Sequence, residues 1–345
     1  MSGTSMDGLD IALVRFDEKN GKWSYDLQHC KTYSYPNNWL DKLANSKQLS
    51  GLELMMADKD LGVYFGERVI EFLREFRLDK NKIDFIASHG HTIFHQPDRR
   101  LTTQIGCGQS IAYTSGIPVI NDFRTKNVLA GGQGAPLVPI GDLLLFPEYD
   151  ACLNIGGFSN ISIKTGGDII AYDVCPGNLP LNIFAQRMGK EYDHGGNLAS
   201  HGTVDDKLLK ELNSLSFYRK DHPKSLGTEW LDEEFMPNMS NSIGDQDALR
   251  TISEHISQQL AETFNRYNVQ NVLITGGGAK NNFLIELLRS KTSAQITVPE
   301  ENIIDFKEAL IFGFLGALYS LKIPNSLASV TGSHEDIIGG VLHTP

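Results

Sequence analysis

The first ten residues of the chain combine glycine, hydroxyl and carboxylate side chains in an order that suits phosphate binding. The candidate ligands are Gly3, Thr4, Ser5, Asp7, Gly8 and Asp10. A turn of small residues lets backbone N–H groups approach an anion closely, and the Thr and Ser hydroxyls add further donors. The two aspartates could hold a hydrated cation beside the phosphates, with Asp7 as the candidate metal ligand. The segment therefore predicts a nucleotide site, while an ordinary tight turn between strands is the simpler interpretation of these residues taken alone.

Two further groups of small residues lie beside predicted strands. Residues 154–160 repeat the small-residue turn of the N-terminus, and the run NVLIT at 271–275 leads through three glycines into a helical segment. A strand that runs into a glycine turn and then a helix favours anion binding at the start of the helix. The candidate nucleotide-binding residues in these groups are Asn154, Gly156, Gly157, Gly276, Gly277 and Gly278. Tight turns or close strand packing would require the same glycines.

Hydrophobic periodicity predicts the elements that must position these groups. Apolar residues recur at helical spacing over 50–76, which predicts a long amphipathic helix. Short β-branched runs at 83–90 and 117–124 follow it, and this alternation predicts a sheet with crossover connections. A glycine turn joins the segments 151–163 and 168–174, which are predicted to be the two strands of a hairpin.

The rest of the chain alternates in the same way. Amphipathic helices are predicted at 249–264 and 281–290, on either side of the strand at 271–275. The last helix, from about Asp305 to Leu321, is apolar on nearly all sides and is therefore predicted to be buried. The sequence thus predicts an α/β fold.

Composition limits the classes of function. A length of 345 residues favours two domains, and a net charge of −11 argues against a nucleic-acid partner, because phosphate neutralisation needs a basic face. The four cysteines lack zinc-ligand spacing and are expected to be free thiols. No apolar run is long enough for a membrane span, and the N-terminus lacks the pattern of a secretory signal. The sequence therefore predicts a soluble, cytoplasmic protein without a membrane partner.

Nine short motifs follow one another along nearly the whole chain. They are SGTSMDGLD at 2–10, SHGHTIFHQP at 88–97, QIGCG at 104–108, NDFR at 121–124, GGQGAPLVP at 131–139, LNIGGFSNIS at 153–162, YDVCPGN at 172–178, ITGGGAKN at 274–281 and FKEALIF at 306–312. In this order they resemble the motifs of the anhydro-N-acetylmuramic acid kinase family, within the superfamily of sugar kinases, actin and Hsp70. Each motif alone is weak evidence, whereas nine in the family's order leave little room for chance.

The resemblance implies a fold, cofactors and partners. The expected fold is α/β: a two-domain, actin-like ATPase (ribonuclease H-like) fold with the nucleotide in the interdomain cleft. We expect residues 1–125 and about 322–345 to form an N-terminal α/β domain, and residues 126–321 to form a C-terminal one. The resemblance also implies ATP and Mg²⁺ as cofactors, a small-molecule amino sugar as substrate, and a homodimer. Residues 276–278 are expected to lie under the adenosine part of ATP.

The family's reaction joins hydrolysis and phosphorylation at one sugar. ATP and water convert 1,6-anhydro-N-acetylmuramic acid, a product of cell-wall recycling, into N-acetylmuramic acid 6-phosphate. Water attacks the anomeric carbon while O6 leaves, through a transition state with oxocarbenium character, and water needs a general base. The residue that matches the family's base is Asp173. Because O6 can capture the γ-phosphoryl group, no second carboxylic acid is required. The residues alone would instead favour Asp173 as a cap or turn former ahead of a helix at 178–188.

Three further residues are expected to contact the sugar. Arg124 follows a strand and could fork a carboxylate, which suits the lactyl group of a muramic acid, although a surface salt bridge is an equal alternative. Glu308 matches a sugar-hydroxyl acceptor of the family. Its position in the first turn of the last predicted helix would also stabilise a carboxylate through the helix dipole alone. His89 is expected to bind the substrate, although it and His91 could simply be histidines at strand ends.

The chain departs from the family's usual pattern at several places. Family members usually have a full apolar strand before the first turn, so half of the first hairpin is expected to be missing here. His91 stands where Gln is common, and Cys107 where Asp or Asn is usual. Val174 and Cys175 precede Pro-Gly-Asn where a small residue and Gly are usual, which would strain the backbone if it required a positive φ there.

Two alternatives to the family's reaction stay open at this point. The chain could be a kinase of the same fold for another sugar, or a sugar- or nucleotide-binding protein that has lost turnover. Retention of Asp173, Arg124 and Glu308 together favours the enzyme, because a binding protein needs no base to activate water.

Overall fold

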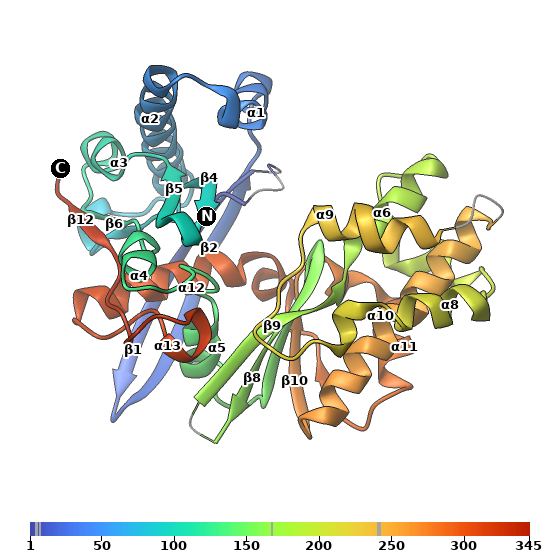
Figure 1. The fold of residues 1–345 in the computed structure, drawn as a ribbon. Coiled ribbons are helices and arrows are strands. Elements are labelled where there is room, and N and C mark those ends of the chain that lie inside the picture. Colours follow the sequence, from blue (N-terminus) through green and yellow to red (C-terminus); the bar gives the residue numbers. More distant parts are fainter. Residues whose placement is uncertain (4–5, 7, 167, 240–242) are drawn as a thin grey trace. The chain divides into compact units, whose positions relative to one another are not determined.

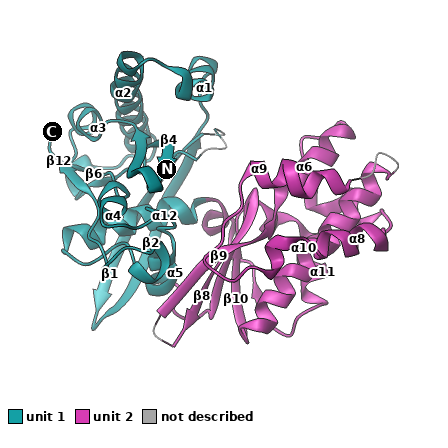
Figure 2. Cartoon of the chain, in the orientation of Figure 1, with its two compact units in different colours: residues 1–145, 306–345 teal, residues 146–305 magenta. Residues whose placement is uncertain are grey.

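The computed structural model describes residues 1–3, 6, 8–166, 168–239 and 243–345. The chain divides into two compact units: unit 1 contains residues 1–145 and 306–345, and unit 2 contains residues 146–305 (Figures 1 and 2). The sequence placed these limits at 125/126 and 321/322 instead. Residues 126–145 and 306–321 join unit 1 because helix α5 (Pro139–Leu145) packs on helix α12 (Glu301–Ser320). Lys307 and Asp142 form a buried ion pair of 2.6 Å between these helices.

Unit 1 contains three separate sheets and most of helix α12. Its strands are β1 (Leu9–Lys19), β2 (Lys22–Tyr33), β3 (Ile86–Ala87), β4 (His91–Gln96), β5 (Leu101–Ile105), β6 (Val119–Asn121) and β12 (Val341–His343). Its helices are α1 (Asn37–Ala44), α2 (Gly51–Glu75), α3 (Gly108–Ser115), α4 (Thr125–Leu129), α5, the greater part of α12, and α13 (Ala328–Thr331). The sheets are the β1–β2 pair, the order β12-β6-β3, and the β4–β5 pair.

The long helix predicted at 50–76 is α2, and local sequence fixes its start. The Ser50 hydroxyl accepts from the Glu53 N–H, and the Glu53 carboxylate accepts from the Ser50 N–H at 2.8 Å, which is a capping box. Leu61, Phe65 and Phe72 on one face are buried. The predicted amphipathic helix is therefore confirmed, with its apolar face in the core of unit 1.

Unit 2 is built on one continuous five-stranded sheet. Its strands are β7 (Ala151–Ile155), β8 (Phe158–Thr165), β9 (Asp168–Pro176), β10 (Asn271–Thr275) and β11 (Gln295–Thr297). Its helices are α6 (Asn178–Arg187), α7 (Asn197–Ser200), α8 (Asp206–Asn213), α9 (Thr228–Trp230), α10 (Asp245–Arg266) and α11 (Asn282–Arg289). The sheet order is β11-β10-β7-β8-β9, with antiparallel pairing along β7-β8-β9 and parallel pairing of β7, β10 and β11.

The predicted hairpin of 151–174 is wrong in one respect. The segment 151–163 is not one strand: a turn at Gly156 and Gly157 splits it into β7 and β8, so the region is a three-stranded meander. The helices predicted at 249–264 and 281–290 are confirmed as α10 and α11. Helix α10 packs its buried face, including Leu249, Ile256 and Leu260, into the core of unit 2.

The state of the cysteines agrees with the expectation from composition. The cysteines are free thiols: Cys30, Cys107, Cys152 and Cys175. Over the described ranges, none of the helices combines the length and the apolar character that crossing a membrane would require.

Candidate active site

The glycine groups of unit 2 meet at one edge of its sheet. Strands β7 and β10 are parallel neighbours, and Asn154 is the register partner of Thr275. Both strands therefore end at the same edge, where Gly156–Gly157 follows β7 and Gly276–Gly278 follows β10. Ligands of open α/β sheets bind outside the carboxyl ends of such strands. The structure thus brings together all six residues of unit 2 that the sequence proposed for the nucleotide.

Close packing explains why two of these positions are glycine. Gly276 has φ +82° and ψ 168°, a conformation open in practice only to glycine, and an added Cβ would lie 2.5 Å from Asn154 Oδ1. At Gly278 an added Cβ would lie 2.2 Å from Ile155 Cγ2. The turn after β10 therefore lies directly against the end of β7, as the close-packing interpretation of these glycines also predicted.

The same edge carries donors that suit phosphate oxygens. Within the described residues, the backbone N–H groups of Gly157, Gly277 and Gly278 have no hydrogen-bond acceptor. The hydroxyl of Thr275 is buried and is likewise without a partner among those residues. Free donors beside a strand end fit the phosphates of a nucleotide, because an anion satisfies N–H groups that the fold leaves unpaired.

A β-bulge positions Asp173 near this edge. Asn160 is the register partner of Asp173 while Ser159 is the partner of Cys175, so Val174 is the extra residue of β9. Bulges of this kind re-aim a side chain and are frequent beside active sites. The Asp173 backbone N–H donates to the Lys224 carbonyl at 3.1 Å, and its carboxylate accepts from the Leu226 N–H at 2.8 Å. The carboxylate is thereby held in one orientation.

Burial raises the pKa of Asp173, while the hydrogen bond from Leu226 lowers it by a smaller amount. A general base works best when its pKa approaches the working pH, so this shift favours the predicted role. The alternative that Asp173 caps a helix is wrong: helix α6 begins at Asn178 after Gly177. The N–H groups of Gly177 and Asn178 donate to Gly157 and Gly156 carbonyls, at 2.9 and 2.8 Å, which joins the segment after Asp173 to the glycine turn.

The strain expected at Val174 and Cys175 is absent. Neither residue has a positive φ, and both side chains are buried. Side chains with a Cβ atom are therefore compatible with the backbone at both positions. Burial raises the pKa of the Cys175 thiol to about 12, which keeps it neutral and unreactive.

In unit 1, the predicted sugar residues Arg124 and His89 contact each other. Arg124 Nε and Nη2 lie 3.1 and 2.9 Å from His89 Nε2. Because Arg is only a donor, His89 Nε2 must be the acceptor, and Nδ1 then donates to the Gly90 carbonyl at 3.0 Å. Burial and the Arg124 charge hold the pKa of His89 well below its usual value, so the ring stays neutral. His89, which lies between the end of β3 and the start of β4, therefore orients Arg124.

A second anchor fixes the other side of the guanidinium. Arg124 Nη1 donates to the Gly134 carbonyl at 2.6 Å, and Gly134 N–H donates to the Asn127 side chain at 2.8 Å. These bonds and those to His89 use three of the five N–H donors of Arg124, leaving two for a further acceptor. Burial lowers the pKa of Arg124 to about 10, against an opposing contribution from Glu308, so the group remains a cation near neutral pH. The surface salt bridge considered from the sequence is not formed in the described structure.

Glu308 lies deeper in its helix than the sequence indicated. Helix α12 starts at Glu301, so Glu308 is its eighth residue and not part of its first turn. The expected helix-dipole stabilisation therefore does not apply, because that effect is confined to the first turn. Desolvation raises the pKa of Glu308, and the Arg124 charge lowers it. The helix thus presents a carboxylate within the electrostatic reach of Arg124.

The N-terminal turn is only partly described. Thr4, Ser5 and Asp7, with the metal role predicted for Asp7, lie outside the described residues. An added Cβ at Gly8 would lie 2.6 Å from Thr32 Cγ2, so this glycine permits close approach to β2. The Asp10 carboxylate accepts from the Thr32 hydroxyl at 2.6 Å.

The Gly3 carbonyl accepts from the Met6 N–H at 3.3 Å. No group of three or more potential metal-ligating side chains occurs within the ranges that the structure describes.

Two departures from the family's pattern have structural partners in unit 1. His91 Nδ1 lies 2.9 Å from the Ser2 hydroxyl, which also accepts from Tyr35 at 2.7 Å. This buried chain anchors the residues that lead into the first turn. Cys107 precedes helix α3, and its thiol lies 3.1 Å from Lys59 Nζ. Sequence analysis missed Ser2 and Tyr35 because their contacts join distant segments.

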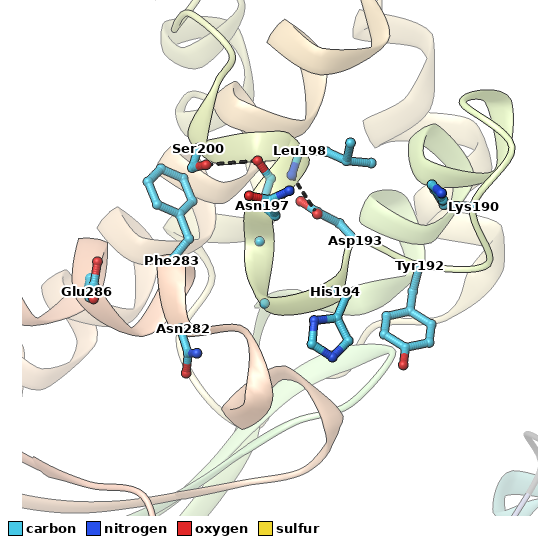
Figure 3. A pocket seen from close by; sticks show the side chains of 12 residues that line it. Lys190, Tyr192, Asp193, His194, Asn197, Leu198, Ser200, Asn282, Phe283 and Glu286 are labelled. Carbon is cyan, nitrogen blue, oxygen red and sulfur yellow. Dashed lines mark hydrogen bonds between the residues drawn. The ribbon is translucent and has the colours of Figure 1, made fainter.

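A pocket of about 600 Å³ in unit 2 was also missed (Figure 3). Residues 190–200 form one wall, and Asn282, Phe283 and Glu286 of α11 form another. Figure 3 shows Tyr192 and His194 side by side, while Asp193 points toward the helix of residues 197–200 and accepts from the Leu198 N–H at 2.7 Å. Helix α11 follows the glycine turn of 276–278, so the pocket is a neighbour of the predicted nucleotide residues.

Comparisons with known proteins were made over the whole chain. The family model described as "Anhydro-N-acetylmuramic acid kinase" matches residues 1–345. Proteins of that name from a Bacillus cereus strain and from Bacillus thuringiensis subsp. konkukian are each 32% identical over 374 aligned residues, covering 100% of this chain and 98% of the relative.

Among solved structures, the activator of 2-hydroxyisocaproyl-CoA dehydratase from Clostridium difficile, with bound ADPNP, matches at 18% identity. Its TM-score is 0.35, with 54% of this chain and 67% of that chain covered. The family match confirms the resemblance that the nine motifs predicted, and with it the predicted α/β fold class.

Proposed function

Because the chain belongs to the anhydro-N-acetylmuramic acid kinase family, we propose that it uses ATP and water to convert 1,6-anhydro-N-acetylmuramic acid into N-acetylmuramic acid 6-phosphate in cell-wall recycling. Water forms the new C1–O bond as the C1–O6 bond breaks, and O6 takes the γ-phosphoryl group as its bond to ADP breaks. The water proton passes to a carboxylate. The reaction therefore needs one base and several donors, without a second carboxylic acid.

The observation that carries this proposal is the environment of Asp173. Its carboxylate is half-buried, has a raised pKa, and is held by the Leu226 N–H beside the glycine turn of β7 and β8. A binding protein would gain nothing from a desolvated carboxylate at this position, since burying a charge has a cost. We assign Asp173 as the base that removes the proton from water.

Arg124 and Glu308 are proposed to bind the sugar. The two remaining N–H donors of Arg124 can fork the lactyl carboxylate, and His89 holds the guanidinium in place for that contact. Glu308 is proposed to accept a hydrogen bond from a sugar hydroxyl. In this scheme His89 acts through Arg124, because both of its ring nitrogens already have protein partners.

The glycine groups are proposed to bind ATP. Gly157, Gly277 and Gly278 supply unpaired backbone donors for phosphates, together with Gly156 and Asn154 of the same edge. The N-terminal turn, Gly3 to Asp10, is proposed to add further donors. Mg²⁺ would neutralise phosphate charge, with Asp7 and Asp10 as the candidate protein ligands.

The pocket of Figure 3 is proposed to take the nucleoside. Its aromatic side chains Tyr192 and Phe283 offer faces for a purine, and it adjoins α11, whose start follows residues 276–278. Binding of a fluorescent ATP analogue should weaken in a Tyr192→Ala variant. We also propose that the protein acts in the cytoplasm as a homodimer.

The decisive experiment follows the oxygen of water. Purified protein is incubated with ATP, Mg²⁺, 1,6-anhydro-N-acetylmuramic acid and ¹⁸O-labelled water, and the products are analysed by mass spectrometry. The expected product is a 6-phosphate that carries the label at C1. N-acetylmuramic acid 6-phosphate in labelled water without protein measures spontaneous exchange at C1. Label only in inorganic phosphate would show ATP hydrolysis and would contradict the proposal.

An Asp173→Asn variant tests the assigned base. We expect kcat to fall by about 10²–10⁴, the usual contribution of a positioned base, with sugar and ATP affinity retained in calorimetry. Asp168→Asn is the matched control, because Asp168 is an exposed residue at the start of the same strand. Loss of sugar binding at unchanged kcat would overturn the role of Asp173.

A further inference from the structure

A segment of unit 2 without helix or strand geometry lies against the strand that carries the candidate base. Residues 220–227 precede α9, and Figure 1 shows them running along β9. Strand β9 ends the sheet order β11-β10-β7-β8-β9, so no further strand covers this edge among the described residues. Residues 220–227, here named the edge segment, therefore cover the open edge of the sheet.

The edge segment bonds to Asp173 at two points. The Asp173 N–H donates to the Lys224 carbonyl at 3.1 Å, which is an ordinary backbone contact of a sheet edge. The Leu226 N–H donates at 2.8 Å to Asp173 Oδ2, a side-chain atom. Among the described residues, only Asp173 and Phe217 share a hydrogen bond with residues 221–226. Covering the sheet edge would need only the first bond, so the second indicates that the segment also holds the carboxylate.

The bond from Leu226 distinguishes the two oxygens of the carboxylate. Asp173 Oδ2 already accepts a hydrogen bond, whereas Oδ1 has no donor among the described residues. Oδ1 is also not sealed from solvent. A general base must lie within hydrogen-bond reach of the proton that it removes, so its open oxygen decides the direction of approach. With Oδ2 anchored, Oδ1 is the oxygen that remains for water.

Aromatic contacts fasten the edge segment. Lys224 Nζ lies 4.6 Å from the centre of the Phe217 ring and 5.6 Å from that of the Tyr172 ring, and it donates to the Phe217 carbonyl at 3.3 Å. The His222 ring stacks on Tyr172, with ring centres 5.8 Å apart and an interplanar angle of 17°. A cation over an aromatic face is attracted by the quadrupole of the ring. Lys224 thus fastens the segment just before the N–H that bonds to the carboxylate.

The charge of Lys224 is directed away from Asp173. Adjacent residues of a strand point to opposite faces, so the Tyr172 ring and the ammonium group over it lie on the other face of β9 from the carboxylate. Burial and the Leu226 N–H are the causes of the shifted pKa of Asp173, and neither is a charge. Lys224 therefore acts on Asp173 through the backbone of the edge segment.

The other groups around Asp173 are neutral or act elsewhere. On β9, the Cys175 thiol interacts with Asp173, and burial keeps that thiol neutral by raising its pKa to about 12. Strand β8 places the uncharged residue Asn160 opposite Asp173. The charge of Arg266, at the end of α10, acts on Tyr172. A change in the pKa of Asp173 after substitution in the edge segment therefore reports the hydrogen bond to its carboxylate.

We propose that Lys224 is a positioning residue for the step that activates water. By fastening the edge segment, it keeps the Leu226 N–H on Asp173 Oδ2 and leaves Oδ1 for the water. Oδ1 accepts the proton as an O–H bond of water breaks, and the water oxygen keeps the electron pair and bonds to C1. This inference rests on the proposed function, because it concerns the base that the reaction requires.

NMR of the protein with ¹³C-labelled aspartate carboxyl groups measures the effect directly. The Asp173 signal is assigned by its absence in Asp173→Asn. Lys224→Met keeps an unbranched side chain without the charge. In this variant we expect the pKa of Asp173 to rise by about one pH unit, because the carboxylate loses a hydrogen bond that favours its charged form. Lys224→Arg keeps the cation and should preserve the pKa, as should Lys220→Met at an exposed residue of the same segment.

The pH dependence of the reaction gives a second measurement. Lys224→Met should move the acid limb of kcat/KM toward higher pH, because Asp173 then stays protonated over a wider range. Above that limb, kcat should fall about 2- to 30-fold, the range of a cation–π contact, while KM for ATP and for the sugar stays unchanged. Lys224→Arg should recover most of the lost kcat. A merely structural role would lower the free energy of unfolding and leave the acid limb in place.

Leu226→Pro removes the N–H itself and should raise the pKa of Asp173 at least as much as Lys224→Met. Ser225→Pro is its control, because the Ser225 N–H has no acceptor among the described residues. An unchanged pKa in Lys224→Met, or an equal rise in Ser225→Pro, would overturn the positioning role. The expected pKa changes, with no labelled 6-phosphate from the unsubstituted protein, would support the hold on the carboxylate and contradict the proposed reaction.

Discussion

The two units support their candidate site residues by different means. In unit 2, the nucleotide candidates are mainly backbone groups at the end of an unbroken sheet, and glycines let β7 and β10 approach each other there. In unit 1, the sugar candidates Arg124 and His89 are long side chains that hold each other and a carbonyl. We therefore expect substitutions at the glycine positions of unit 2 to disturb the local backbone and to weaken ATP binding. Substitutions of Arg124 or His89 in unit 1 should instead weaken sugar binding and leave the fold intact.

Gly276→Ala should have the largest effect. An alanine must take φ +82° and place its Cβ 2.5 Å from Asn154 Oδ1, so we expect a loss of about 1–3 kcal/mol in the free energy of unfolding, with a raised KM for ATP. Urea unfolding and steady-state kinetics measure both. Gly166→Ala is the control, because it also has a positive φ but no atom within 4 Å of an added Cβ. An unchanged KM for ATP in Gly276→Ala would contradict the role of this glycine turn of unit 2 in ATP binding.

Arg124→Lys should have the second-largest effect, and it should weaken sugar binding. Lysine keeps the charge but cannot contact His89, Gly134 and a carboxylate at once, so we expect KM for the sugar to rise about 10- to 100-fold, the value of one or two charged hydrogen bonds. The unfolding free energy should change little. Arg99→Lys, an exposed residue whose guanidinium contacts only Gln96 among the described residues, should leave KM unchanged. A fall in kcat alone would argue against carboxylate binding by Arg124.

His89 should show a smaller effect that a similar side chain rescues. His89→Leu removes the acceptor for Arg124, so KM for the sugar should rise severalfold, whereas His89→Gln can offer an oxygen and should recover part of the loss. His95→Gln, at an exposed residue of β4, is the control. If His89→Leu and His89→Gln raise the KM for the sugar equally, His89 does not act through an acceptor atom.

The pH dependence of stability should be the smallest effect and should occur in both units. Burial lowers the pKa of His89 in unit 1 and lowers that of His255 in unit 2 to about 3, so both are neutral when folded. Unfolding frees them to bind protons below their ordinary pKa of 6.5. Stability is therefore full above about pH 6.5 and falls as the pH drops from there toward the folded pKa, by at most about 1.4 kcal/mol per pH unit for each histidine.

Unfolding free energies measured between about pH 5 and pH 8 test this dependence. His255→Asn should reduce the dependence of the unfolding free energy on pH. A flat profile for the unsubstituted protein would contradict neutral burial of these histidines.

Local signals in the sequence were sufficient for the longest elements. The capping residues Ser50 and Glu53 lie next to the helix that they start, so α2 could be predicted from its own segment. The break between β7 and β8 could not be predicted in this way. Both strands are apolar, and only Gly156 and Gly157 separate them. The start of α12 was also missed: the helix begins at Glu301, before the apolar run that predicted it, and Lys280 contacts Glu301 and Asp305 of this first part at 3.1 and 2.8 Å.

The candidate residues were predicted individually, but their contacts were not. Nothing in the separate motifs around His89 and Arg124 indicates that one orients the other, because 35 residues separate them. The bulge at Val174 was likewise hidden, since an extra residue in a strand has no signature of its own. The pocket of residues 190–200 lacked any motif that the sequence analysis recognised.

Asn127 ties the support of Arg124 to a remote part of unit 1. Its side chain is fully buried, its oxygen holds Gly134, and its Nδ2 lies 2.8, 2.8 and 3.2 Å from the hydroxyls of Ser326, Thr331 and Ser333. An apolar replacement at any of these positions would leave a buried polar group unpaired. We therefore expect position 127 and the three hydroxyl positions to covary: across relatives, these residues should change together or not at all.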